Sequence, residues 1–182
     1  MKIKAEKFIS DLVEQTEKNL NEAEDLNQKS LTTLNFKSSD EKWNALECIE
    51  HLNLYSVYYL REIEKRINRS NTSAEEYFKS GIIGNYFAKT MLPEDNFRKM
   101  KTFKDKDPSG SSLNKTSIQK FLADQQLLLT LLKESKKISL NKTKVPLSIS
   151  KWIKLRLGGV FRVVIYHNQR HLLQAKQMLN NL

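Results

Sequence analysis

The sequence predicts an all-α protein, built as a bundle of four long helices. Its 182 residues are enough for one domain with a substantial core. Only five Gly and three Pro are present, fewer than an all-β fold with many tight turns would use. Apolar residues also recur at helical spacing in four long segments. We therefore expect residues 1–182 to form a single helical-bundle domain.

The first two helices are predicted from one-sided apolar patterns. From Lys4 to Asn27 apolar residues recur every three or four positions, as on one face of a helix. Polar residues interrupt this pattern between Leu31 and Lys42, which predicts a connection. A second helix is expected from about Asn44 to Asn68, with Trp43 at its start.

A long linker, Asn71 to Asn114, separates the second helix from the third. Within it, Ser73 to Glu76 resembles a capping box, and Tyr77 to Leu92 is expected to form one or two short helices that end before Pro93. The charged, turn-rich stretch from Lys99 to Ser112 predicts a flexible loop. Because the linker could cross the bundle, the pattern alone leaves the helix topology open.

The last two helices lie on either side of an irregular segment. The third is expected from about Lys115 to Ser135, and residues 136–150 read as extended. A short helix is predicted through Trp152 and Leu155. We expect Gly158-Gly159 to separate it from the fourth long helix, Val160 to Leu179.

Charge and composition narrow the class of protein. The formal net charge of +10 suits acidic ligands, nucleic acid or a membrane surface, and equally suits simple solubility. A single cysteine excludes an intramolecular disulfide. Residues 1–15 lack the apolar core of a signal peptide, and the apolar runs are too short to span a bilayer. We expect a cytoplasmic protein with no membrane partner.

The three histidines are the candidate metal ligands. His167 and His171 lie four residues apart on the fourth helix, about 40° apart around the helix and about 6 Å apart along it. They and His51, on the second helix, all lie where an apolar face meets a polar one. Three imidazoles that meet there would leave a coordination position open on Zn²⁺, and would also suit Ni²⁺, Cu²⁺ or Fe²⁺, among which affinity order alone does not choose. The simpler alternative is that the short motif is two surface or capping histidines.

Several residues near these histidines are candidates for roles at the site. Glu47, one turn before His51, could orient an imidazole or act as a general base, or it could be a solvated helix residue. The candidate substrate contacts, each with an equally simple core or surface role, are Tyr55, Tyr58, Arg170 and Gln174. Cys48 lies on an apolar face and is expected to be a small buried hydrophobe.

Eight basic residues precede the fourth helix. They are Lys133, Lys136, Lys137, Lys142, Lys144, Lys151, Lys154 and Arg156. If they rim the metal cleft they would attract an anionic thiol or an acidic substrate; otherwise they form a solvated face. No recognition-helix, zinc-finger or aromatic RNA-binding signature accompanies them, so a nucleic-acid partner is not expected.

One motif is Trp43 followed by Glu47-Cys48-Ile49-Glu50-His51-Leu52, and a second is His167-Asn168-Gln169-Arg170-His171-Leu172-Leu173-Gln174-Ala175. Two motifs in this order resemble the DinB-like superfamily of bacterial metal-binding bundles. The resemblance implies a four-helix bundle with up-down-down-up connectivity. It also implies one divalent metal, commonly zinc or nickel, on His51, His167 and His171. Several characterised members transfer a low-molecular-weight thiol such as bacillithiol, or use mycothiol in an isomerisation.

The leading hypothesis is therefore a three-histidine metalloprotein that acts as a metal-dependent thiol transferase or a related hydrolase on a small-molecule substrate. A coordinated thiol loses its proton, which would let it attack an electrophile. The rival hypothesis is a binding or stress-associated bundle whose metal is structural or whose site is silent. A basic nucleic-acid-binding module is the third, and a homodimer is open under each.

Overall fold

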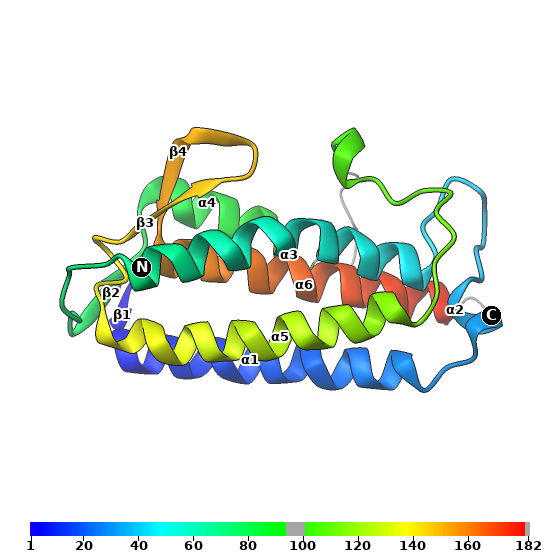
Figure 1. The fold of residues 1–182 in the computed structure, drawn as a ribbon, viewed down its shortest axis with the longest axis horizontal. Helices are drawn as coiled ribbons and strands as arrows, with labels where there is room; N and C mark the ends of the chain where they lie inside the picture. The colour runs from blue at the N-terminus through cyan, green and yellow to red at the C-terminus, as the bar shows by residue number, and fades with distance from the viewer. Residues whose placement is uncertain (94–100, 181–182) are drawn as a thin grey trace.

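Four long helices lie side by side in a computed structural model that describes residues 1–93 and 101–180 (Figure 1). They are α1 (Ala5–Asn27), α3 (Ala45–Asn68), α5 (Thr116–Glu134) and α6 (Leu157–Leu179). By the colours of Figure 1, α1 and α6 run from left to right, and α3 and α5 run from right to left. Helices α1 and α3 each pack against both α5 and α6. Each predicted long helix is confirmed to within three residues at both ends.

Short elements decorate the bundle. The helical ones are α2 (Leu31–Leu34), α4 (Ile82–Thr90) and the 3-10 turns η1 (Lys104–Lys106) and η2 (Ser135–Lys137). The strands are β1 (Lys2–Lys4), β2 (Tyr77–Lys79), β3 (Lys144–Leu147) and β4 (Ser150–Arg156). Strand β1 pairs antiparallel with β2, and β3 pairs antiparallel with β4. The fold is therefore mostly helical, and the prediction that it is all-α was wrong for these two small sheets.

The short helix predicted through Trp152 and Leu155 is instead strand β4. Leu155 pairs with Val145 of β3, and both are buried against the bundle. Cross-strand hydrogen bonds together with this burial hold the segment extended, and its apolar pattern is too short to distinguish a strand from a helix. We refer to β3, β4 and the turn between them as the hairpin.

Two further local predictions were wrong. Gly158 lies inside α6 instead of before it. A Cβ at this position would come within 2.6 Å of the Phe78 ring, so the glycine permits close packing here and does not end a helix. Ser73 to Glu76 starts no helix and leads into strand β2. The Glu75 carboxylate accepts hydrogen bonds from Ser139 and Asn141 and thereby ties this segment to the loop before β3.

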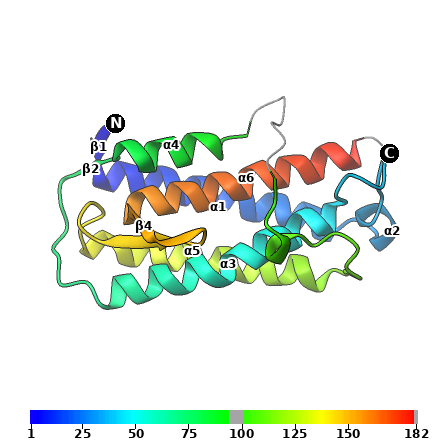
Figure 2. The same ribbon diagram turned by 90° about the horizontal axis from the view of Figure 1, so that it is seen from above.

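The segment predicted as a flexible loop starts at Lys99, and its first two residues lie outside the described part of the chain. From residue 101 onward it contains η1 and lies against α3 (Figure 2). Its hydrogen bonds to Trp43 and His51 hold it near the start of that helix. Its flexibility stays a prediction.

The buried side chains form two clusters, and the histidines lie between them. The cluster near the strands includes Phe78, Phe161 and Ile165. The cluster near α2 includes Leu46 and Leu172. Along α6, the first cluster ends before the histidine pair and the second begins directly after it. Within the described residues, no helix is long and apolar enough to cross a membrane.

Candidate metal centre

Helix α3 begins with a capping box that fixes where its side chains point. The Asn44 side chain accepts a hydrogen bond from the Glu47 backbone N–H at 2.8 Å, and the Glu47 carboxylate accepts one from the Asn44 backbone N–H at 2.9 Å. Such reciprocal bonds satisfy two backbone donors that a helix start leaves without partners. With the start of the helix fixed, His51 faces α6.

The three histidines meet between α3 and α6. Nε2 of His51 lies 3.2 Å from Nε2 of His167, and the ligand atoms of all three rings, with His171, lie within 4.8 Å of one another. His51 is buried, with 4% of its surface exposed, whereas His167 is partly exposed. The prediction that these residues come together from two helices is confirmed.

Hydrogen bonds on the outer nitrogens set the tautomers of two of the rings. Nδ1 of His51 donates to the backbone carbonyl of Lys106 at 2.8 Å. Nδ1 of His171 donates to Oε1 of Gln174 at 2.9 Å. A neutral ring that carries its hydrogen on Nδ1 has a lone pair on Nε2, which is the form a metal needs. His51 and His171 are thus prepared to bind a metal through Nε2.

The distance between the ligand nitrogens of His51 and His167 fits one divalent ion. Two imidazole nitrogens at 2.0–2.1 Å from a tetrahedral Zn²⁺ would lie about 3.3–3.4 Å apart. The 3.2 Å between Nε2 of His51 and Nε2 of His167 is close to this value. Three neutral imidazoles are also a donor set that zinc and nickel accept. The residues present therefore fit the metal that the resemblance implies.

Burial keeps the imidazoles neutral. It lowers the pKa of His51, and it lowers the pKa of His167 well below the ordinary value of 6.5. The pKa of His171 falls to about 3, mainly through burial and secondly through the charge of His51. Because only a neutral imidazole has a lone pair for a metal, these shifts make the ligands available over a wide pH range.

Two aromatic rings enclose the histidines. The Trp43 ring centroid lies 4.8 Å from that of His51 and 5.8 Å from that of His171. Tyr55 lies 5.0 Å from His51 and 5.1 Å from His167 by the same measure. Burial raises the pKa of Tyr55 to about 12, so its hydroxyl stays protonated at neutral pH. These rings keep water from much of the cluster.

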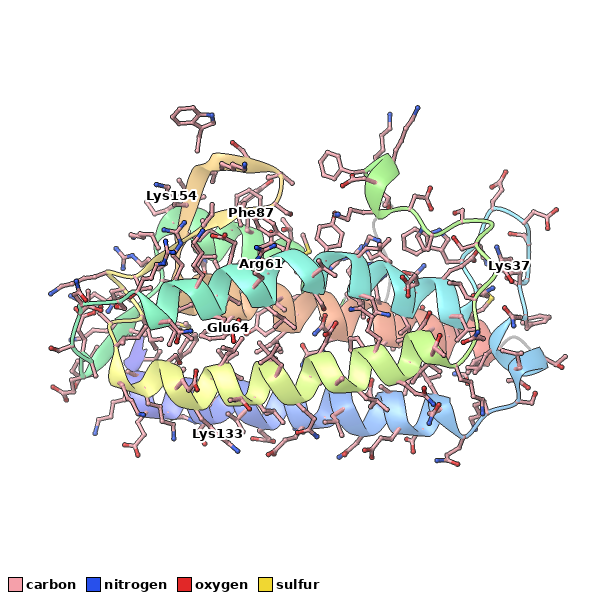
Figure 3. The ribbon with its side chains drawn as sticks, viewed as in Figure 1. Lys37, Arg61, Glu64, Phe87, Lys133 and Lys154 are labelled. Atoms are coloured by element: carbon pink, nitrogen blue, oxygen red, sulfur yellow. The ribbon has the colours of Figure 1, made fainter. Side chains whose placement is uncertain are left out.

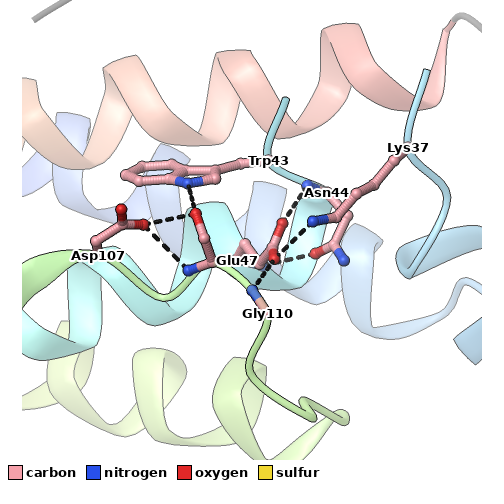
Figure 4. A network of polar contacts seen from close by, with 7 residues as sticks. Lys37, Trp43, Asn44, Glu47, Asp107 and Gly110 are labelled. Carbon is pink, nitrogen blue, oxygen red and sulfur yellow. Dashed lines mark hydrogen bonds and ion pairs between the residues drawn. The ribbon is translucent and has the colours of Figure 1, made fainter. Parts of the chain in front are cut away.

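A polar network ties the loop after η1 to the start of α3 (Figure 4). The indole N–H of Trp43 donates to Ser109 at 2.9 Å, and the Ser109 hydroxyl donates to Asp107 at 2.6 Å. The Gly110 backbone N–H donates to the Glu47 carboxylate at 3.1 Å. The loop next to the Lys106 carbonyl is therefore held by Trp43 and Glu47, both near the start of α3.

Glu47 has a position that sequence reasoning did not foresee. The residue is buried, with 1% of its surface exposed. Its carboxylate forms an ion pair with Lys37 at 2.7 Å and accepts hydrogen bonds from the backbone N–H groups of Asn44 and Gly110. Among the described contacts it therefore supports the loop that orients His51, and touches no imidazole directly. Its predicted role as a general base stays a prediction.

The other candidate residues divide between the site and the scaffold. Gln174 orients His171, as described above, and Tyr55 packs on two histidines. Tyr58 donates to the carbonyls of Pro146 and Leu147, both at 3.4 Å, and so supports the hairpin. Arg170 is buried in α6, and its predicted substrate contact stays a prediction.

The lone cysteine takes no part in the cluster. Cys48 is fully buried, and burial raises the pKa of its thiol far above the usual range. Its prediction as a small buried hydrophobe is confirmed. Two contributors to the site were missed in the sequence: the Lys106 carbonyl, which has no side-chain signature, and Trp43, which was predicted only to anchor the helix start.

A small pocket opens beside the cluster, between α3 and α6. It is lined by Leu52, Tyr55, Ser56, Tyr59, Val163, Val164, His167 and Asn168. The hydroxyl of Tyr59, one of these residues, is hydrogen-bonded to Ser148 in the turn of the hairpin at 3.1 Å. The pocket therefore gives the exposed side of His167 a mostly apolar neighbour.

The eight basic residues do not form a single rim around this site. Lys133, on α5, and Lys154, on the hairpin, point away from opposite sides of the bundle (Figure 3). Lys106 and Arg170 bring positive charge to the site. The Lys106 ammonium group lies 5.8 Å from the centroid of the Tyr55 ring and is paired with Asp105 at 3.0 Å, and the charge of Arg170 helps to lower the pKa of His167 and His171. The basic stretch of sequence is thus distributed over separate surfaces.

A helical bundle whose buried histidines converge from two helices is the arrangement of a metal-binding protein. The sequence matches the family described as the DinB superfamily over residues 12–175. This chain belongs to the DinB superfamily. Comparisons with curated proteins and with solved structures return no match. The family and the three-histidine cluster together fit a metal-binding member of the superfamily.

Proposed function

We propose that the chain is a metal-dependent enzyme, a thiol S-transferase or a related hydrolase, with zinc or nickel on its three histidines. The observation that carries the proposal is the open side of the cluster: the histidines are closed on the Trp43 side, whereas partly exposed His167 borders a small pocket of about 20 Å³, room for about one water molecule. A structural site is normally closed by four protein ligands, whereas a catalytic site keeps a position for substrate. The proposal includes up-down-down-up connectivity, supported by the helix directions in Figure 1.

The chemistry follows from the groups around the pocket. A divalent ion held by the histidines would act as a Lewis acid and lower the pKa of a thiol or water bound to it. Tyr55 keeps its proton and can donate a hydrogen bond to a group bound next to His167. Lys106, beside the Tyr55 ring, would attract an anionic small molecule. The apolar lining would exclude competing water.

Metal content tests the first half of the proposal. Protein purified without a metal-affinity tag should contain about one divalent ion per chain, and the substitutions His51→Ala and His171→Ala should remove it. Gln169→Ala, on the same helix as the histidine pair, serves as the matched control and should keep the metal. Stoichiometric metal that survives both histidine substitutions would contradict the assigned ligands.

Turnover tests the second half. Several low-molecular-weight thiols are offered together with generic electrophiles to metal-loaded protein and to protein stripped by a chelator. Metal-dependent consumption of one thiol would support the transferase, and metal-dependent ester or amide cleavage would support the hydrolase. If the protein binds its metal but turns over nothing in this panel, the binding or stress-associated bundle becomes the better description.

A further inference from the structure

The net charge of the chain is concentrated in its last quarter. Residues 135–182 contain ten of the 31 Lys and Arg residues and none of the 21 Asp and Glu residues. The remainder of the chain therefore carries 21 residues of each sign, and the whole formal charge of +10 arises after residue 134. The hairpin lies in this stretch, and α4 likewise contains one lysine and no acidic residue.

The hairpin exposes side chains on both faces of strand β4. Residues 151–154 are all exposed, although alternate residues of a strand beside a core are normally buried. Trp152 is 94% exposed, and Ile149 and Ile153 are 48% and 37% exposed. Lys151 and Lys154 flank the indole in sequence. By strand alternation Trp152 and Lys154 share one face, and Lys151 and Ile153 share the other, so each exposed face of the strand pairs an apolar side chain with a lysine.

Helix α4 extends this apolar surface. Ile82 is 92% exposed, Ile83 58% and Tyr86 65%. The helix contacts both β4 and α6, and Gly81, the residue before the helix, lies beside the guanidinium group of Arg156 at the end of β4. In Figures 1 and 2 the hairpin and α4 lie at the same end of the bundle, on the side away from α1 and α5. We refer to the exposed residues of these two elements as the docking face.

We propose that the docking face binds the surface of an anionic phospholipid bilayer. Tryptophan and tyrosine prefer the boundary between headgroups and acyl chains, and exposed isoleucines gain free energy when they enter it. Lysines beside them are attracted to anionic headgroups. The docking face provides all three kinds of side chain, and the hairpin and α4 contain no acidic residue that would repel the headgroups.

Two other occupants fit the docking face less well. A second copy of the chain would bring one hairpin's lysines towards a surface that lacks acidic residues of its own, so like charges would oppose each other. Nucleic acid would satisfy the lysines, but would leave the four exposed isoleucines in water. An anionic bilayer satisfies both the charged and the aliphatic side chains.

This proposal goes beyond the sequence prediction of no membrane partner. The length of the apolar runs bears only on spanning a bilayer, which needs about 20 apolar residues in one helix. Contact with the surface needs only a few exposed apolar side chains and nearby positive charge. It is also independent of the metal centre, because no histidine belongs to the docking face.

The test uses the full chain with two kinds of vesicle, phosphatidylcholine alone and phosphatidylcholine with about 30% phosphatidylglycerol. We expect binding to the anionic vesicles only, with a blue shift of tryptophan emission and quenching by brominated acyl chains. Trp152→Ser should remove the shift and weaken binding about tenfold. Circular dichroism should show that this variant stays folded, because the replaced side chain is almost fully exposed.

A charge-matched pair completes the test. Lys154→Glu, on the hairpin, and Lys133→Glu, on the opposite side of the bundle, change the net charge equally. We expect Lys154→Glu to weaken vesicle binding about tenfold and Lys133→Glu no more than twofold. Equal effects, or no binding to anionic vesicles, would overturn the proposal. So would a dimer in sedimentation that Trp152→Ser dissociates, or tight DNA binding that Lys154→Glu removes.

Discussion

Two imidazoles of the cluster have one nitrogen fixed by a hydrogen bond. His51 donates from Nδ1 to a backbone carbonyl and turns Nε2 towards His167, and His171 donates from Nδ1 to Gln174. An imidazole held this way cannot rotate without losing a hydrogen bond in a buried place. Folding therefore orients these ligand nitrogens before a metal binds, so little ordering is left for the binding step.

Glu47→Gln tests whether the carboxylate helps to orient His51. The substitution keeps the size but removes the charge that Lys37 pairs with and weakens the bond from Gly110. We expect a loss of about 1–3 kcal/mol in the free energy of unfolding. We also expect metal affinity to fall about tenfold, because partners behind a metal ligand usually contribute that much.

Three measurements decide this prediction. Chemical denaturation gives the stability, competition with a chelator gives the affinity, and nitrogen NMR of the metal-free protein gives the tautomer of His51. Glu50→Gln is the matched control, since the Glu50 carboxylate accepts a bond from Asn53 at 2.9 Å. If stability falls while the affinity and tautomer stay the same, Glu47 caps the helix and does nothing for the site.

The buried histidines also predict how stability depends on pH. An unfolded chain protonates His171 below about pH 6.5, whereas the folded protein resists until its pKa of about 3. The unfolded state therefore binds more protons in this window, and the free energy of unfolding falls as pH falls through it. At pH 5 the loss for this residue should be about 2 kcal/mol.

Urea denaturation of chelator-treated protein at pH 7.5, 6 and 5 would measure this loss. His171→Gln lacks the titrating group, so its stability should fall less steeply over the same range. The other two histidines also have lowered pKa values and would add to the slope of the parent protein. A free energy of unfolding that stays constant from pH 7.5 to 5 would show that protons reach the folded imidazoles freely.

The three histidines could be predicted from the sequence, whereas the groups that orient them could not. Helical spacing fixes the direction of a side chain once a helix is recognised, so His167 and His171 could be placed on one face. The acceptor for His51 is a backbone carbonyl on a distant loop, at Lys106, and any residue could provide it. Such partners depend on tertiary structure alone.

Among the elements, long helices were predictable and short strands were not. Helix α3, for example, repeats its apolar spacing over six turns, so one misleading residue changes little. Strand β4 has only seven residues, and both of its faces are largely exposed. Its apolar pattern therefore carries almost no signal, and its pairing with β3 holds it in place.

The two adjacent glycines of α6, Gly158 and Gly159, allow a test of how closely this helix packs against strand β2. Gly158→Ala would place a Cβ 2.6 Å from the ring of Phe78, which is itself stacked on Phe8 at 4.3 Å and cannot move away easily. We expect a destabilisation of about 1–3 kcal/mol. Gly159→Ala meets only ordinary contacts, at 3.8 Å or more, and should gain up to about 1 kcal/mol from helix propensity.

Thermal and urea unfolding of the two variants would compare them directly. They differ by one position and by the same methyl group, so each is the other's control. Equal stabilities would mean that Phe78 has more room than its buried position indicates. A loss confined to Gly158→Ala would assign this glycine to packing between α6 and β2.

For the whole molecule, the cluster links two helices that are far apart in sequence. His51 of α3 and the histidine pair of α6 are separated by more than a hundred residues, and they lie between the two apolar clusters of the core. An ion bound to all three would bind the folded state far better than the unfolded one. Metal binding should therefore stabilise the entire bundle, so that the metal site and the fold would lose their structure together.

Removal of the metal should consequently lower the melting temperature. At a free metal concentration about 1,000 times the Kd, the expected stabilisation is about 4 kcal/mol, which corresponds to about 10 °C for a chain of this size. Calorimetry with and without a chelator would measure the difference, and His51→Ala should abolish it. If that variant still melts higher with added metal, the ion binds elsewhere. The parent protein could instead hold one ion per chain and show no shift in melting temperature. The ion would then be bound by surface ligands that still bind it after unfolding, and the three histidines would serve only as buried polar residues between the two apolar clusters.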